Sequence, residues 1–132
     1  MRLDIANTLT VVQSLAPASR TATGNGTGVD LRDYSAAVAI IDTGTAGGTS
    51  PSFTFELQES DDNSTFTAVA AADLIGTEPV ITTSNDVAVY ELGYLGSKRY
   101  IRVAITAVSG TSPTLLCSAC VVRGKPRYAP AA

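Results

Sequence analysis

The sequence contains no histidine, and it has only two cysteines and one methionine. Histidine is the commonest general base in enzymes and the commonest metal ligand, so its absence removes most familiar catalytic and metal-binding arrangements. The chain also lacks a G-x-S-x-G nucleophile motif and a glycine-rich dinucleotide fingerprint. We therefore expect a protein that is not an enzyme, with no catalytic residues, no cofactor and no bound metal.

Long apolar runs are missing as well. No stretch of about 18 apolar residues occurs that could cross a membrane. Asp4 and Asn7 interrupt the start of the chain, where a signal peptide would need a continuous apolar segment. We therefore expect no membrane association and no secretion.

The helix formers Lys and Glu are scarce, whereas Thr, Val, Ile and Gly are abundant, which is the composition of strands and turns. Residues 33–42, DYSAAVAIID, are apolar on both faces of an extended chain, a pattern typical of a central strand. Residues 52–60 alternate between apolar and polar side chains, which predicts a half-buried strand that forms a hairpin with residues 65–69.

Three further stretches have the pattern of strands, and they cover residues 87–92, 99–108 and 114–122. Turn signals rich in Gly, Ser and Pro separate the strands at residues 42–51 and 109–113, and residues 70–87 are expected to be irregular.

The 132 residues are enough for one domain. The strand spacing predicts an all-β fold, an antiparallel β-sandwich or jelly roll. Within it, residues 1–28 are expected to form an extended arm with at most one or two short strands. Residues 29–122 are expected to form the sandwich core, and residues 123–132 a proline-containing tail that cannot continue a sheet.

Three motifs suggest chemistry but favour structural roles. Residues 93–98, GYLGSK, have the composition of a phosphate-binding loop, but the glycines are too close together and a strand pattern follows, so we predict a hairpin turn. Cys117 and Cys120 have C-x-x-C spacing, yet residues three apart in a strand face opposite sides, which favours small buried hydrophobes over a zinc or redox site. Asp61 and Asp62 suit a turn better than a calcium or acid–base site.

Charge is divided unevenly along the chain. All twelve acidic residues lie at or before Glu91, and six of the nine basic residues lie after it. This basic region is rich in tyrosine and arginine, which favours a protein interface over a solvated surface. Nucleic acid is disfavoured because the whole chain is acidic. The residues predicted to contact a partner are Leu3, Ile5 and Leu9 of the arm and Lys98, Arg99, Arg102, Arg123, Lys125, Arg127 and Tyr128 of the basic region.

Four segments carry a resemblance to a known family: MRLDIANTL at the start, LQESDDNSTFTAV in the middle, and YLGSKRYIRVAITAV and VVRGKPRYAP near the end. Together they resemble small proteins from the head-gene region of tailed bacteriophages, in particular the head cement proteins typified by that of a Bordetella phage. The alanine-rich residues 68–72 have no counterpart in this resemblance.

The resemblance implies a jelly-roll-like capsid cement or decoration protein, expected to be a homotrimer. Such a protein binds the major capsid protein on the outer face of the phage head, so it would be located on the virion after assembly in the host cytoplasm. Other phage structural roles, in a tail tube, in head completion or at a fibre base, are the alternative. A carbohydrate-binding adhesin module is less favoured because the chain has no tryptophan for stacking on sugars.

Overall fold

The computed structural model describes residues 1–130 of the chain, and within this range it confirms the all-β, antiparallel prediction. Regular structure other than strand is limited here to two three-residue 3-10 helices, η1 (Ala6–Thr8) and η2 (Ala71–Asp73). All strands belong to one nine-stranded sheet. They are β1 (Leu9–Arg20), β2 (Gly24–Asn25), β3 (Val29–Asp30), β4 (Tyr34–Ser60), β5 (Thr67–Ala68), β6 (Leu74–Ile75), β7 (Val80–Ile81), β8 (Val89–Tyr94) and β9 (Tyr100–Pro126).

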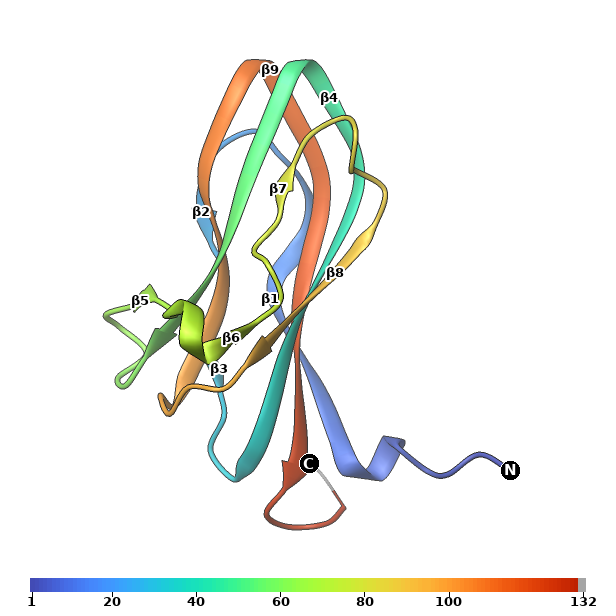
Figure 1. Ribbon diagram of the computed structural model, residues 1–132, viewed down its shortest axis with the longest axis vertical. Coiled ribbons are helices and arrows are strands. Elements are labelled where there is room, and N and C mark those ends of the chain that lie inside the picture. Colours follow the sequence, from blue (N-terminus) through green and yellow to red (C-terminus); the bar gives the residue numbers. More distant parts are fainter. Residues whose placement is uncertain (131–132) are drawn as a thin grey trace.

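Two 27-residue strands, β4 and β9, pair along their whole length and form the frame of the molecule. Their ladder runs from Tyr34 opposite Pro126 to Ser60 opposite Tyr100. Figure 1 shows that this two-stranded ribbon bends over at the top of the molecule, so that both of its ends point downward. The bend divides the sheet into two parts.

We call these parts half-sheet A and half-sheet B. Half-sheet A contains β1, the second half of β9, the first half of β4, β8 and β6, in that order. In half-sheet B, the first half of β9 pairs with β2 and β3, and the second half of β4 pairs with β5 and β7. Half-sheet A therefore has a wide five-stranded ladder, whereas half-sheet B is edged by strands of two residues.

The inner faces of both half-sheets meet in one hydrophobic core. Ile41 and Val121 come from half-sheet A, and Phe55, Leu57 and Val103 come from half-sheet B, and each has at most 1% of its surface exposed. Phe55, Leu57 and Val103 follow the alternation predicted for residues 52–60 and 99–108. Burying each such side chain contributes roughly 1.5–3 kcal/mol, which is why the register of β4 against β9 is well defined.

The predicted turns at residues 42–51 and 109–113 are wrong as chain reversals, because β4 and β9 run through both segments. The glycines of these two segments nevertheless shape the bend of the ribbon. Gly48 and Gly110 have φ angles of +97° and +109°, and they lie near the point where Thr49 pairs with Thr111. Irregularities in the register fall in the same place. Because the two turn-like segments lie opposite each other in the β4–β9 pairing, they bend the ribbon while the pairing continues on both sides of the bend.

The hairpin predicted at GYLGSK is also wrong. β8 pairs with β4 and β6 in half-sheet A, whereas the start of β9 pairs with β3 and with the end of β4 in half-sheet B, so the segment between them crosses from one half-sheet to the other. Its glycines are required for close packing. A Cβ on Gly93 would lie 2.9 Å from that of Ile75, and one on Gly96 would lie 2.6 Å from the ring of Tyr94. The predicted hairpin between residues 52–60 and 65–69 is confirmed by the pairing of β4 with β5.

The extended arm predicted for residues 1–28 is not confirmed. Leu9–Arg20 is a 12-residue strand, β1, paired with β9. The buried hydroxyl of Ser14 holds it further, since it accepts the N–H of Val103 at 3.0 Å. Apolar alternation in this strand is interrupted by two register shifts, which hid it from the sequence pattern. Of residues 1–28, residues 1–8 precede the sheet (Figure 1), and residues 21–23 and 26–28 connect β1, β2 and β3.

The tail predicted from residue 123 onward is wrong for residues 123–126, which continue β9 to Pro126. Pro126 ends the strand as expected, because it has no N–H to donate to a ladder. Residues 127–130 follow the sheet, and the last two residues of the predicted tail lie outside the described residues.

Candidate interaction surfaces

The first candidate surface is the N-terminal segment, residues 1–5, which projects from the lower end of the molecule (Figure 1). Leu3 and Ile5 are 87% and 66% exposed, whereas Leu9 is half-buried at the start of β1. Asp4 anchors the segment, since its carboxylate accepts the backbone N–H of Ala6 at 2.8 Å. Hydrogen bonds from Asn7 lower the pKa of Asp4. The segment thus has a fixed base and an exposed apolar end.

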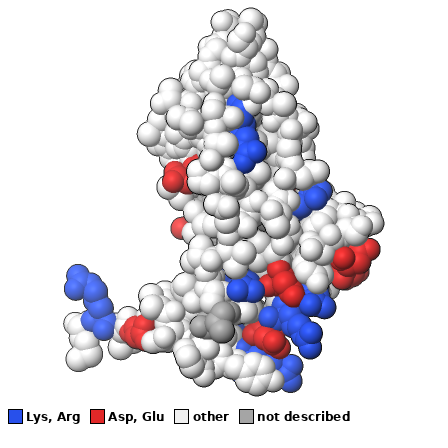
Figure 2. All heavy atoms as spheres, turned by 180° about the vertical axis from the view of Figure 1, so that it is seen from behind, with Lys and Arg blue, Asp and Glu red and all other residues white. Residues whose placement is uncertain are grey.

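The second candidate surface is the basic region, and two of its cations are paired with acids of the same chain. Arg99 forms two hydrogen bonds to Asp30, at 2.9 and 2.8 Å. Lys98 forms an ion pair with Asp61 at 2.7 Å. The hydrogen bonds from Arg99 lower the pKa of Asp30, and Asp61 raises the pKa of Lys98. Blue and red atoms accordingly alternate over the lower part of the molecule in Figure 2.

Two further arginines are held by aromatic rings and polar groups. Arg102 lies over the ring of Phe66 at 4.0 Å and donates to the side chain of Gln58 at 2.8 Å. Arg123 lies 4.4 Å from the ring centre of Tyr34 and donates to the hydroxyl of Thr10. These contacts fix the positions of both guanidinium groups. Arg102 projects from the face opposite Ile101, Val103 and Ile105, as predicted.

The last predicted interface residues lie near the end of the chain. The guanidinium of Arg127 is 5.8 Å from the ring of Tyr128, which is 67% exposed, and the side chain of Lys125 is exposed. Tyr128 and Arg123 line a hollow of about 220 Å³ that also includes Tyr34. Within residues 1–130, neither Lys125 nor Arg127 forms an ion pair. Both side chains are exposed to solvent.

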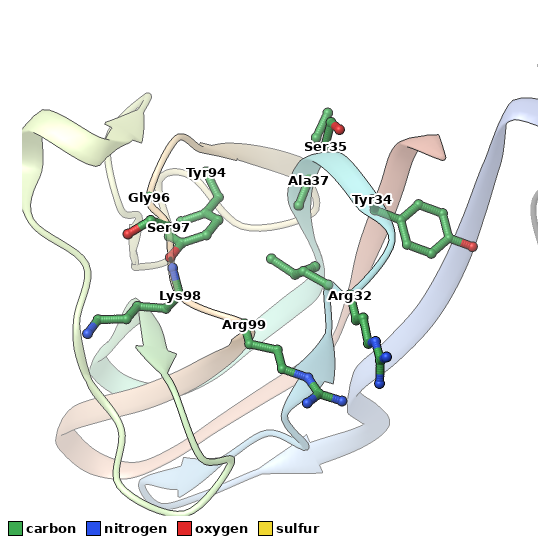
Figure 3. A pocket seen from close by; sticks show the side chains of 11 residues that line it. Arg32, Tyr34, Ser35, Ala37, Tyr94, Gly96, Ser97, Lys98 and Arg99 are labelled. Atoms are coloured by element: carbon green, nitrogen blue, oxygen red, sulfur yellow. Dashed lines mark hydrogen bonds between the residues drawn. The ribbon is translucent and has the colours of Figure 1, made fainter. Parts of the chain in front are cut away.

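A pocket of about 320 Å³ lies beside GYLGSK, where the sequence suggested a phosphate loop. Figure 3 shows that Lys98 and Arg99 point away from the middle of this pocket, while the ring of Tyr94 lines it. Their charged groups are turned toward Asp61 and Asp30. Tyr94 donates its hydroxyl to Glu59 at 2.8 Å, and burial raises the pKa of that hydroxyl. This geometry is not that of an anion site.

The thiols and the paired aspartates also have structural roles. Cys117 is buried and Cys120 is half-buried, both are free, and burial raises the pKa of each. Asp62 accepts backbone N–H groups of Ser64 and Thr65, which is the predicted turn. No group of three or more side chains able to hold a metal ion occurs in residues 1–130, and no helix in this range is long and apolar enough to cross a membrane.

The third surface was missed by the sequence prediction: it is the outer face of half-sheet A. Val38 and Ile40 of β4 and Val122 of β9 point away from the core and are half-buried, and Val11 of β1 is 58% exposed. The sequence does contain a pattern that indicates this apolar outer face, because residues 33–42 are apolar on both faces of the strand. We interpreted it as a strand buried on both sides, whereas only its inner face lies in the core of the described chain.

The chain matches no known family model, and it matches no curated protein. Function must therefore be inferred from the three surfaces.

Proposed function

We propose that the chain is a structural virion protein, a capsid cement or decoration protein that binds the major capsid protein on the outer surface of a phage head. The observation that carries this proposal is the projecting N-terminal segment. Leu3 and Ile5 are exposed on it, and Asp4 fixes its base against η1. Burying apolar side chains of this kind against a neighbouring protein favours association, and nearby charges set the register.

Two other features support a binding role. The body is a sheet with a single apolar core, and the chain has no histidine for acid–base or metal chemistry. Lys125 and Arg127 are exposed and lie close to the C-terminal end of the chain, which is at the lower end of the molecule with the N-terminal segment (Figure 1). An acidic patch on the capsid would match them, whereas the acidic total charge disfavours nucleic acid.

The finer fold class and the assembly belong to the same proposal. A long two-stranded ribbon that bends over a shared core is the construction of a jelly roll, so we propose a jelly-roll-like sandwich. Following the resemblance, three copies would assemble on the virion in the host cytoplasm. In a tail-tube, head-completion or fibre-base role, the same exposed surfaces would join copies of the chain into a ring.

The test is addition of the purified protein to undecorated phage heads. Occupancy is measured by mass or electron microscopy, and the heads are then challenged by heat. We expect binding, greater heat resistance, and loss of both in the variant Leu3→Asp/Ile5→Asp. The control Thr106→Lys changes an exposed residue on β9, far from the segment in sequence, and should bind normally. Heads that stay bare with the unchanged protein refute the proposal. A ring of six or twelve copies in solution favours the tail or head-completion role.

A further inference from the structure

The outer face of half-sheet A carries a continuous apolar row across all five strands. Val11 of β1 lies opposite Val122 of β9, Val122 opposite Val38 of β4, Val38 opposite Gly93 of β8, and Gly93 opposite Ile75 of β6. Paired residues of neighbouring strands share one face of a sheet, so the five positions form a band across the outside.

The neighbouring rows are apolar on their central strands. In one direction along the strands, Leu9, Gly124 and Ala36 are aligned. In the other direction, Cys120 and Ile40 form the middle of a row that ends in Gln13 of β1 and Glu91 of β8. An antiparallel sheet with one solvated face normally alternates apolar residues inward with polar residues outward. This face departs from that rule, and large apolar side chains on or beside it, Val11, Ile75, Val89 and Leu116, are each more than half exposed.

The described chain covers this face only in part. Val38, Ile40 and Val122 are half-buried, and they are not members of the core cluster of residues 1–130. Two shallow apolar hollows lie on it, one of about 470 Å³ that includes Val38 and Val122, and one of about 380 Å³ that includes Leu116. Five strands spaced about 4.8 Å apart, over about eight residues of β4, span roughly 500 Å². This span is more than half of the roughly 800 Å² per partner of a standard stable interface.

We infer that the outer face of half-sheet A is a self-association surface, which a second copy of this chain covers with the same face. Two sheets packed face to face lie about 10 Å apart and interdigitate their side chains. The small residues Ala36, Gly93 and Gly124 make this face flat enough for such a contact. A two-fold contact is self-complementary, so one apolar face covers the other.

The charges at the rim of the face favour the second copy as occupant. Asp42 follows Ile40 on β4, toward the bend, and Lys125 lies at the opposite end of the face, next to Gly124. A pair of copies in antiparallel orientation, centred near the Val38 row, brings Asp42 of each copy toward Lys125 of the other. Asp42 and Glu91 on this face would repel an acidic partner protein, and they would repel the phosphates of nucleic acid in the same way.

The inference is tested on the full chain in the absence of phage heads, so its outcome is independent of the proposed function. Sedimentation or light scattering over a range of concentrations should give twice the monomer mass. Val11→Lys and Ile75→Lys, both at positions more than half exposed, should each weaken self-association at least tenfold. Neither should lower thermal stability at concentrations where the unchanged protein is a monomer. Thr106→Lys, on the outer face of half-sheet B, is the matched control and should leave the pair intact.

The thiols supply a second measurement, because Cys120 lies on the outer face and Cys117 on the inner face. Maleimide labelling of Cys120 should slow as protein concentration rises and should become independent of concentration in Val11→Lys. Labelling of Cys117, which is 5% exposed, should stay slow throughout and report any unfolding. A monomer at all concentrations, or a larger assembly that Val11→Lys and Ile75→Lys do not disturb, overturns the inference.

Discussion

The two half-sheets are built from the same two strands, yet their outer faces differ. In half-sheet B, Glu56 and Gln58 point outward from β4, and Arg102 of β9 is bonded to Gln58 and stacked on Phe66. In half-sheet A, the equivalent outward positions are Val38, Ile40 and Val122. The inner faces are alike, so both halves contribute to folding. The outer faces differ in their cover: half-sheet B is covered by its own polar side chains, whereas half-sheet A carries the apolar face that we propose is covered by a second copy.

The largest expected effect comes from a substitution in the hydrophobic core that the two half-sheets share. Phe55 of half-sheet B is 1% exposed in the common core. Phe55→Ala should therefore lower the free energy of unfolding by about 3–5 kcal/mol, through lost burial and the cavity left behind. Urea unfolding followed by circular dichroism and by tyrosine fluorescence should show one transition for both probes. The control Glu56→Ala, one residue away on the outer face, should change stability by less than about 0.5 kcal/mol. Two separate transitions would mean that the halves fold independently.

A smaller effect is expected at the bend that joins the halves. Gly110 has a φ angle of +109°, and a Cβ there would lie 2.6 Å from the carbonyl oxygen of Ser50. Gly110→Ala should cost about 2 kcal/mol, since it forces both a strained backbone and a shift of the opposite strand. Gly24→Ala is the control, because a Cβ on Gly24 meets nothing within 4 Å and its φ is not positive. Equal thermal stability of the two variants would contradict this account of the bend.

The bend also explains how far the sequence predicts the fold. The all-β class, the hairpin of residues 52–60 with 65–69 and the buried positions of Phe55 and Val103 follow from local alternation, and the structure confirms them. Residues 42–51 and 109–113 have the composition of turns, but they bend the ribbon of β4 and β9 and do not reverse the chain. Whether such a signal reverses the chain or bends a ribbon depends on whether a second signal lies opposite it, about 60 residues away in the sequence. Local patterns carry no information on that pairing.

The candidate surfaces show the same limit. Leu3, Ile5 and Leu9 are predicted to contact a partner because they lie in a segment without sustained periodicity; Leu3 and Ile5 are exposed, whereas Leu9 is half-buried at the start of β1. The pairing of Arg99 with Asp30 spans 69 residues and was not predicted. The outer face of half-sheet A was visible as an apolar pattern in residues 33–42. That pattern is the same for a strand covered on both sides within one chain and for a strand covered by a partner. Only the arrangement of the neighbouring strands distinguishes the two cases.

A third prediction concerns how half-sheet B protects its edge. The carboxylate of Glu78 accepts the N–H of Leu57 at 2.6 Å, which satisfies a donor on β4 beside the core. Glu78→Ala should cost about 1 kcal/mol, because that donor loses its partner. Burial raises the pKa of Glu78, so the folded state holds its proton more tightly than the unfolded state does. Stability from this group therefore falls as pH rises from the ordinary glutamate pKa through the raised one.

Glu78→Gln separates the two contributions of this side chain. Glutamine keeps an acceptor for Leu57 and has no charge to bury, so the variant should be at least as stable as the unchanged protein at neutral pH. It should also lack the decline between the two pKa values, as measured by thermal unfolding across the acidic range. A Gln variant as unstable as Glu78→Ala would show that the charge itself stabilises the edge.

The smallest expected effect lies in the charged contacts at the lower end of half-sheet B. Asp30 and Arg99 form a bidentate pair, but both side chains are partly exposed, so Asp30→Asn should cost only about 0.2–1 kcal/mol at neutral pH. Arg99 lowers the pKa of Asp30, so the pair stabilises the folded state above the ordinary aspartate pKa, and this contribution is lost as pH falls through the lowered value. Thermal unfolding of both proteins from neutral pH to about pH 2 should show the two curves converging.

Asp61→Asn serves as the control for that pair, because Lys98 contacts Asp61 through a single ion pair with a more exposed carboxylate. Its effect should be smaller than that of Asp30→Asn and should be screened more completely by salt. If both substitutions cost several kcal/mol, the lower end of half-sheet B is held by charge rather than by the apolar core. The two half-sheets would then differ in the interactions that stabilise them, charge in half-sheet B and apolar burial in half-sheet A, as well as in the polarity of their outer faces.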